Sequence, residues 1–329
     1  MIRLLSIASI LASAVSGAAL AQGVADVYPS KPVRIIVGNA PGGGVDTVSR
    51  LVAGRLTERW KYPVVVENRA GASGRIAQDE VAKATPDGYT LLLGGNSLVI
   101  GMLLKRIPFD IRKVYDPIVQ LTTQSYLLVT HPSVPATTVK ELVAYAKSRP
   151  GVMNHGTAGP GSLAHLGMSL FDVLSGTHIT HIPYKGGGPA MTDLLSGRTQ
   201  VLLGPSVSVI NHVRGGKLKL LAVSAEKRVP SMPNLPTIAE SGVPGYELSN
   251  TYGFYAPVGT PSAATAVINR ESNLIIRMPE FVAKLTADGV EAAPANTAAE
   301  YRNTIEREYQ KWDRFFKTPG LKMELFLEG

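Results

Sequence analysis

The chain has 329 residues, of which 45% are hydrophobic, and its 33 Lys and Arg against 25 Asp and Glu give a formal net charge of +8. It contains no cysteine, which excludes disulfides, thiol chemistry and lipid attachment at an N-terminal cysteine. The basic residues are scattered along the chain rather than grouped with aromatic residues, so we expect no nucleic-acid partner. A modest positive field of this kind favours the arrival of acidic small molecules.

The first 21 residues have the pattern of a secretory signal peptide. Arg3 supplies the positive start, residues 4–15 the apolar segment, and Ala19-Leu20-Ala21 a small-x-small cleavage site. The apolar run is too short for a membrane anchor, so we expect cleavage after Ala21 and a soluble exported protein, periplasmic in a Gram-negative source. Loss of Arg3 lowers the net charge to +7, and removing 21 of the 329 residues leaves 308, enough for two domains.

The mature chain starts with a strand, a glycine turn and a helix. Residues 33–37 predict a strand buried on both faces, Gly42 to Gly44 a turn without side chains, and residues 46–56 a helix. The unpaired N–H groups of the first helical turn carry partial positive charge, so this backbone suits a carboxylate or phosphate. The alternative is a tight connection that binds nothing.

The same order of strand, glycine turn and helix recurs in the next segment. Residues 62–68 predict a strand that leads to a glycine turn and a helix at 75–84, and residues 89–93 predict a strand that ends in Gly94-Gly-Asn-Ser97. This order is typical of an open parallel sheet, which binds ligands outside the carboxyl ends of its strands.

A long extended segment, residues 118–131, predicts a strand that carries the chain into a second α/β domain. Thr138 is the expected N-cap of a helix at 139–148. Further strands are expected at 153–157, 179–184, 200–203 and 218–224, with helices at 163–174 and 190–196. The second domain therefore has its own set of glycine turns.

Residues 249–257 predict a second extended crossing, followed by helices at 263–277, 279–288 and 297–316 that we expect to pack on the first domain. The predicted domains are residues 22–126 with 250–329, and residues 127–249. Two α/β lobes joined by two extended crossings, with glycine turns facing each other, form the architecture of a hinged solute-binding protein.

Ordered motifs across nearly the whole mature chain resemble the Bug or TctC family, the substrate-binding proteins of tripartite tricarboxylate transporters. The motifs are Tyr28-Pro-Ser-Lys-Pro-Val-Arg-Ile-Ile-Val37, Pro41-Gly-Gly-Gly-Val-Asp46, Val64-Val-Val-Glu-Asn-Arg-Ala-Gly-Ala-Ser-Gly74, Pro86-Asp-Gly-Tyr-Thr-Leu91, Gly156-Thr-Ala-Gly-Pro-Gly-Ser162 with His165, Ile182-Pro-Tyr-Lys-Gly-Gly-Gly-Pro-Ala190 and Gly216-Lys-Leu218. The resemblance implies a type II periplasmic-binding-protein fold and a small carboxylate, either a di- or tricarboxylate or an aromatic acid, held between the lobes. It also implies a monomer without a cofactor that delivers its ligand to an integral membrane permease, with a sensor kinase as a second candidate partner.

The resemblance also implies that backbone amides and hydroxyls of the glycine loops contact the ligand. The candidate ligand-binding residues are Asn39, Pro41, Gly42, Gly43, Gly44, Asp46, Gly71, Ala72, Asn96, Ser97, Thr157, Gly161, Ser162, Leu163, His165, Tyr184, Gly186, Gly187, Gly188, Pro205 and Ser206.

Four positions depart from the family pattern. Val45 stands where Ser or Thr is usual, Arg75 where Asn is common, Gly204 where Asp is frequent, and Tyr252 where Trp is usual. Without an acid at position 204, a ligand that carries an ammonium group is less well supported.

Three catalytic or cofactor motifs are incomplete, so an exported α/β enzyme is the alternative rather than the main hypothesis. Residues 159–164 fit the dinucleotide pattern G-x-G-x-x-A, but no Asp or Glu lies between Val173 and Thr192 to bind a ribose. His178 and His181, the nearest histidine pair in the sequence, would point to opposite faces of a strand, which argues against zinc. Residues 204–208 lack the final glycine of a nucleophile elbow. We therefore expect no catalytic residues and no metal.

Three polar side chains near the glycine turns have competing roles. His165 either touches the ligand or, as we favour, holds its loop, and Arg75 is a surface residue or an anion contact. Lys185 is a solvated lysine or a charge clamp. Because no pair of arginines lies within the turns, we expect backbone N–H and hydroxyl groups, with Ser162 and Thr157 ahead of Lys185, to hold the carboxylate.

Overall fold

The computed structural model describes residues 28–39, 41, 44–71, 74–287, 289–319, 321 and 326. The expected signal peptide and its cleavage site after Ala21 lie outside these residues. Within the described part of the chain, no helix combines the length and the apolar character needed to cross a membrane.

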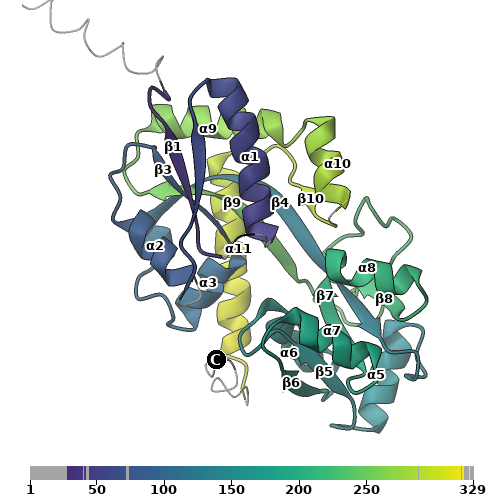
Figure 1. The fold of residues 1–329 in the computed structure, drawn as a ribbon. Coiled ribbons are helices and arrows are strands. Elements are labelled where there is room, and N and C mark those ends of the chain that lie inside the picture. Colours follow the sequence, from purple (N-terminus) through teal and green to yellow (C-terminus); the bar gives the residue numbers. More distant parts are fainter. Residues whose placement is uncertain are drawn as a thin grey trace, which may run out of the picture.

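The first lobe is built on a twisted sheet whose parallel strands come from the N-terminal part of the chain (Figure 1). Its strands are β1 (Val33–Val37), β2 (Val64–Asn68), β3 (Thr90–Gly95), the first part of β4 (Tyr115–Thr130), β9 (Ser249–Pro257) and the short β10 (Glu291–Ala292). β1 pairs in parallel with β2 and β3, whereas β9 runs antiparallel between β3 and β4. The predicted strands at the N-terminus are therefore confirmed, and they share one edge of the sheet at their carboxyl ends.

Helices cover both faces of this sheet. They are α1 (Gly44–Trp60), α2 (Arg75–Ala82), α3 (Asn96–Leu103), α4 (Ile111–Val114), α9 (Ser262–Ile275), α10 (Pro279–Ala287) and α11 (Ala298–Phe316). Successive residues of β1 show the two layers, because Ile35 packs in the core under α1 and α9 while Ile36 packs in the core under α2 and α11. Both isoleucines are fully buried, as expected for a strand covered on both sides.

The second lobe repeats this layered plan with strands β5 (Asn154–Thr157), β6 (Thr180–Pro183), β7 (Val201–Pro205) and β8 (Lys219–Val223) and helices α5 (Val139–Ser148), α6 (Leu163–Ser175), α7 (Gly187–Leu195) and α8 (Ser206–Arg214). β5 lies between β6 and β7 in parallel pairing, while β7 and β8 both pair antiparallel with the end of β4. Thr138 caps α5 in a reciprocal capping box with Glu141, as its sequence predicted.

The long strand β4 joins the two lobes. Its residues up to Ser125 pair with β9, and from Tyr126 onward they pair with β7 and β8. We use this change of partner to distinguish the lobes in description. The domain boundaries expected from the sequence, after residues 126 and 249, remain predictions.

One expectation needs correction, and two helices were not predicted. The helices at the C-terminus do not all pack on the first lobe, because α11 starts there and extends toward the second lobe (Figure 1). Its last turns place Trp312 and Phe315 in the core of the second lobe, where Phe326 joins them. In addition, two helices that the sequence analysis did not predict, α3 and α8, directly follow β3 and β7. The apolar residues of these two helices follow directly after the apolar residues of the strands, so the hydrophobic period does not show where the strand ends and the helix begins.

Gly253 allows β9 to pack under α11, and an alanine there should destabilise the protein. A Cβ on Gly253 would meet the carbonyl oxygen of Val119 and lie 2.5 Å from the hydroxyl of Tyr301. We expect Gly253→Ala to lower the free energy of unfolding by about 1–3 kcal/mol or more. The matched control is Gly54→Ala, because Gly54 is exposed on α1 and no atom lies within 4 Å of the position that a Cβ would take, so this variant should stabilise by about 0.5–1 kcal/mol. Urea unfolding of both variants measures the difference, and equal midpoints would contradict this packing.

Candidate functional site

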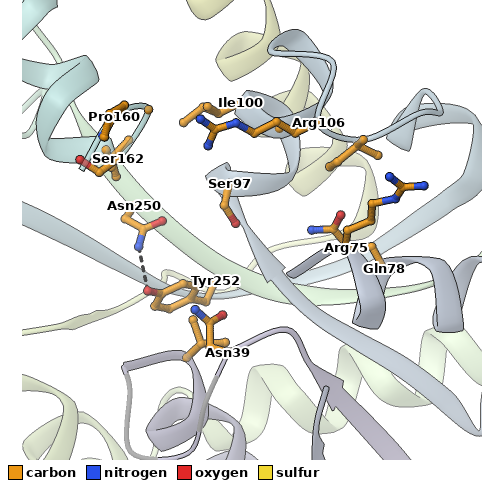
Figure 2. A pocket seen from close by; sticks show the side chains of 15 residues that line it. Asn39, Arg75, Gln78, Ser97, Ile100, Arg106, Pro160, Ser162, Asn250 and Tyr252 are labelled. Carbon is orange, nitrogen blue, oxygen red and sulfur yellow. Dashed lines mark hydrogen bonds between the residues drawn. The ribbon is translucent and has the colours of Figure 1, made fainter. Parts of the chain in front are cut away.

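A cavity of about 300 Å³ lies between the two lobes, and we call it the interlobe cavity (Figure 2). It is lined by Asn39, Val45, Arg75, Gln78, Ser97, Ile100, Gly101, Arg106, Ile107, Pro160, Gly161, Ser162, Leu163, Asn250 and Tyr252. A second cavity of about 300 Å³ shares Asn39, Val45, Gln78, Ser97 and Tyr252 with it and extends toward Gly71 and Gly74. The two cavities are therefore adjacent, along the carboxyl ends of β1 and β3.

The interlobe cavity is formed where strands end and helices begin. The first lobe contributes the end of β1, the first turns of α1, α2 and α3, and the turn after α3, while the second lobe contributes the turn between β5 and α6. Asn250 and Tyr252 of β9 form part of the wall, and the Asn250 side chain donates a hydrogen bond to the Tyr252 hydroxyl (2.8 Å; Figure 2). The N-terminal turns of α2 and α6 have N–H groups without intrahelical partners, which favours an anion.

The turn before α6 is held in place by its own side chains. Ser162 is the N-cap of α6, and its hydroxyl oxygen accepts from the backbone N–H of His165 (3.3 Å). The N–H of Gly161 in turn donates to Nδ1 of His165 (3.2 Å), and Gly161 has a φ of +67°, a conformation that favours glycine. Since the Ser162 oxygen is an acceptor here, its O–H proton stays available to donate into the cavity.

Behind this turn three histidine rings are stacked. His165 of α6 lies 3.7 Å from His181 of β6 between ring centroids, and His181 lies 5.1 Å from His155 of β5. The stack forms because β5 and β6 pair in parallel and place His155 beside His181. The spacing of His178 and His181 in the sequence does not reveal this neighbour. Within the described part of the chain no group of His, Cys, Asp and Glu is arranged to hold a metal ion.

The stacked histidines are held in the neutral form. Burial lowers the pKa of His165 to about 3 and that of His181 to about 4, and the neighbouring His181 ring adds to the effect on His165. Burial also lowers the pKa of His155 well below its ordinary value. Neutral His165 can accept the Gly161 N–H, and Nε2 of His181 lies 2.7 Å from the Thr157 hydroxyl, so the stack supports the turn from behind.

Two arginines, and no aspartate or glutamate, are among the described residues that line the two cavities. Arg75 is half-exposed and pairs with Asp79 one helical turn away (3.4 Å). Arg106 donates from Nη2 to the carbonyl oxygen of Phe326 (2.7 Å). The charge of the lining therefore favours an anionic ligand.

Six of the candidate residues from the sequence line these cavities: Asn39, Gly71, Ser97, Gly161, Ser162 and Leu163. Gly42, Gly43 and Ala72 lie outside the described residues. The structure does not place the other twelve in the lining: Pro41, Gly44, Asp46, Asn96, Thr157, His165, Tyr184, Gly186, Gly187, Gly188, Pro205 and Ser206.

Several residues of this last group support the site from outside. Asp46 pairs with Arg50 (2.9 Å) and accepts from the side chain of Asn68 (2.9 Å) at the start of α1. Asn96 donates to the carbonyl oxygen of Ser249 (2.7 Å) and accepts from the hydroxyl of Thr251, so it fixes α3 to β9.

The structure also adds lining residues that the sequence did not single out: Gln78, Ile100, Gly101, Arg106, Ile107, Pro160 and Asn250. Arg106 is the most important of them because it is charged. It was missed because it follows α3, a helix that the sequence pattern did not predict, and no glycine turn marks its position. The pair of cations Lys105-Arg106, directly after an apolar run that follows a strand, was the available signal.

The site contains no serine–histidine catalytic pair among its described residues. The Ser162 hydroxyl bonds to the backbone of His165, not to its ring, and the ring nitrogen Nδ1 is occupied by Gly161. A nucleophilic serine needs a base within hydrogen-bond reach of its hydroxyl. The arrangement therefore suits binding rather than acyl transfer.

The histidine stack predicts a specific pH dependence of stability. The unfolded chain protonates these histidines near pH 6.5, whereas the folded chain does so only near pH 4 or below, so their stabilising contribution is complete above pH 6.5 and is lost as the pH falls toward 4. We expect His181→Gln to reduce the fall in unfolding free energy between pH 6 and 4.5 by about 1.4 kcal/mol per pH unit. Urea unfolding across this range measures it, with a constant difference between the two proteins above pH 7 as internal control. Parallel curves throughout would contradict a neutral stack.

Comparison with known proteins identifies the family of this chain. The family model described as "Tripartite tricarboxylate transporter family receptor" matches residues 48–321. The chain is 36% identical over 303 residues to Protein BugT of Bordetella pertussis, covering 91% of this chain and 93% of that protein.

Two solved structures from Rhodopseudomonas palustris have a similar fold. Rpa4515, solved with adipate, shares 32% identity and a TM-score of 0.76 over 89% of this chain and 98% of that one. MatC, solved with bound malate, shares 28% identity and a TM-score of 0.72 over 87% and 99% of the two chains. These relatives have the two-lobed fold of type II periplasmic binding proteins and are solute receptors, not enzymes. The chain therefore belongs to the Bug/TctC family of tripartite tricarboxylate transporter receptors.

Proposed function

We propose that this receptor is exported to the periplasm, binds a small carboxylate in the interlobe cavity and delivers it to the integral membrane permease of a tripartite transporter. The single observation that carries the ligand class is the lining itself. It combines helix N-termini and hydroxyls from both lobes with two arginines and has no acid among its described residues. Such a lining stabilises a carboxylate and, among its described residues, has no acid that would repel it. An ammonium group would find no counter-charge there.

The relatives support a carboxylate with more than one acid group. Rpa4515 was solved with adipate and MatC with malate, both dicarboxylates. We therefore place dicarboxylates first among the candidate ligands, with tricarboxylates and aromatic acids as further members of the class. A monomer that also reports to a sensor kinase is compatible with this role and forms part of the proposal.

We propose that the six candidate residues in the lining contact the ligand directly. Ser162 is placed best, because its hydroxyl proton is free to donate and the turn around it is fixed by His165. Asn96, Thr157 and His165 then act through the residues that they hold. The change of partner along β4 between Ser125 and Tyr126 supports the proposed boundary near residue 126, and the boundary after residue 249 stays a prediction.

A ligand screen tests the proposed function. We expect a thermal-shift panel of dicarboxylates, tricarboxylates, aromatic acids and amino acids to contain at least one stabilising carboxylate. A ligand at 100 times its dissociation constant adds about 2.7 kcal/mol to the stability of the folded state. Amino acids should stabilise less than dicarboxylates because of their ammonium group. Chemical turnover of the stabilising compound by the purified protein would contradict a receptor.

A pair of variants tests which groups hold the carboxylate. We expect Ser162→Ala to weaken binding by about tenfold or more, because a hydrogen bond to a charged group contributes about 1.5–3 kcal/mol. Lys185→Met should change affinity little, since Lys185 is exposed and outside the lining, where an ion pair is worth about 0–1 kcal/mol. Calorimetry with a ligand from the screen measures both.

Loss of a helix cap needs its own control in this comparison. Thr138→Ala removes the N-cap of α5, also in the second lobe but outside the cavity lining, and should lower stability by about 0.5–2 kcal/mol without a comparable loss of affinity. A severe loss of binding in Lys185→Met beside a small one in Ser162→Ala would show that a cation of the α7 turn, not the turn before α6, holds the ligand.

A further inference from the structure

Arg106 is a cation at the boundary between the lobes. It follows α3 in the first lobe and lines the interlobe cavity (Figure 2), and its guanidinium lies against Gly161 of the second lobe. A Cβ at Gly161 would lie 2.9 Å from Nη2 and 3.1 Å from Nη1 of Arg106, so only a residue without a side chain leaves room for this approach. The guanidinium therefore faces the same turn that carries Ser162.

The charge of Arg106 has no carboxylate partner among the described residues. The hydrogen bond recorded for its side chain goes to the neutral carbonyl oxygen of Phe326. A guanidinium has five N–H donors in a fixed planar arrangement, so this bond orients the group and leaves further donors for an acceptor in the cavity. Phe326 is itself fixed, because it is 1% exposed and stacks on His165 with 4.7 Å between ring centroids.

Arg75 provides a contrast within the same cavity. Its charge is paired with Asp79, and in Figure 2 it lies with Gln78, away from the Pro160 and Ser162 side that Arg106 faces. The lining near Arg106 also contains the apolar side chains of Ile100, Ile107 and Leu163. The part of the cavity that faces the second lobe thus has an apolar surface and a cation, Arg106, without a carboxylate partner among the described residues. The other part, near Asn39 and Ser97, has amide and hydroxyl groups.

We propose that Arg106 is a specificity-determining residue that binds a second acid group of the ligand, so that the receptor selects diacids with an apolar spacer over the corresponding monoacids. This inference rests on the proposed function. The first carboxylate is held by hydroxyls and helix N-termini, which a monoacid also satisfies. The second acid group forms a charge-assisted, potentially bidentate pair with the guanidinium, which a neutral group cannot replace. A monoacid would leave the partly buried cation of Arg106 without a counter-charge from the ligand.

A purely structural role for Arg106 makes a different prediction. If Arg106 only ties the first lobe to the carbonyl oxygen of Phe326, its loss lowers stability and weakens all ligands alike. The ratio of diacid to monoacid affinity separates the two roles, because a structural tie does not act on the difference between the ligands.

The experiment compares matched ligands by calorimetry. The probes are succinate, adipate and phthalate, each beside its monomethyl ester, which removes one charge and keeps the spacer. We expect the wild type to bind at least one diacid tenfold or more tightly than its ester, and Arg106→Gln to lose tenfold or more in affinity for the diacid but less than twofold for the ester. Arg75→Gln, which removes the same charge from the same cavity, should leave the ratio of diacid to ester largely unchanged.

The outcomes distinguish this inference from the proposed function. If the wild type binds none of these acids or esters and no carboxylate of the ligand screen stabilises it, the proposed function is wrong and the inference falls with it. If the wild type binds esters as tightly as diacids, or if Arg106→Gln weakens both equally, the receptor stands and the role of Arg106 is refuted. Should Arg106→Gln fail to fold, Arg106→Lys replaces it: this variant keeps the charge but not the planar fork, so it should retain only part of the preference for the diacid, and an unchanged ratio would refute the role of Arg106.

Discussion

The antiparallel pair of β4 and β9 is the constraint on which both lobes and the cavity depend. β9 completes the first sheet between β3 and β4, and β4 continues into the second sheet without a break. The same β9 residues, Asn250 and Tyr252, form part of the cavity wall. Because strand pairing fixes register, the position of the wall relative to the turns of both lobes is set by backbone hydrogen bonds rather than by flexible side chains.

Polar groups behind the cavity hold this arrangement together. Asn96 joins α3 to β9 and donates to Glu308 of α11, which also accepts from Lys311 (2.6 Å). Lys311 reaches Glu247 of the second lobe as well (2.6 Å), and although burial alone would lower its pKa, the two carboxylates raise it. A buried charge of this kind is costly unless it is paired, so the network favours one relative position of α11, β9 and the second lobe.

The parts of the fold that the sequence predicted are those governed by local rules. The two-sided burial of Ile35 and Ile36 and the Thr138 cap of α5 follow from short patterns, and both are confirmed. The histidine stack and the passage of Trp312 into the second core depend on which strands and helices become neighbours, so no local pattern could show them. For the site, the glycine turns predicted Gly161 and Ser162, which line the cavity. Arg106 was not predicted, because tertiary packing places it there and because it follows α3, a short apolar helix that the hydrophobic pattern does not distinguish from a strand.

The passage of the chain between lobes also sets an order for chain synthesis. Strands β5 to β8 and their helices form one contiguous stretch, whereas the first sheet waits for β9 and its helical layers wait for α9 and α11. As the chain grows from its N-terminus, β1 to β3 emerge first yet lack the strand that lies between β3 and β4. Contacts between residues far apart in the sequence form late, because the entropy cost of closing the long intervening loop comes before any stabilisation from the contacts. The first sheet, although its strands are made first, therefore closes only after the strands of the second lobe have been made, and both lobes wait for α11, which places Trp312 and Phe315 in the second core.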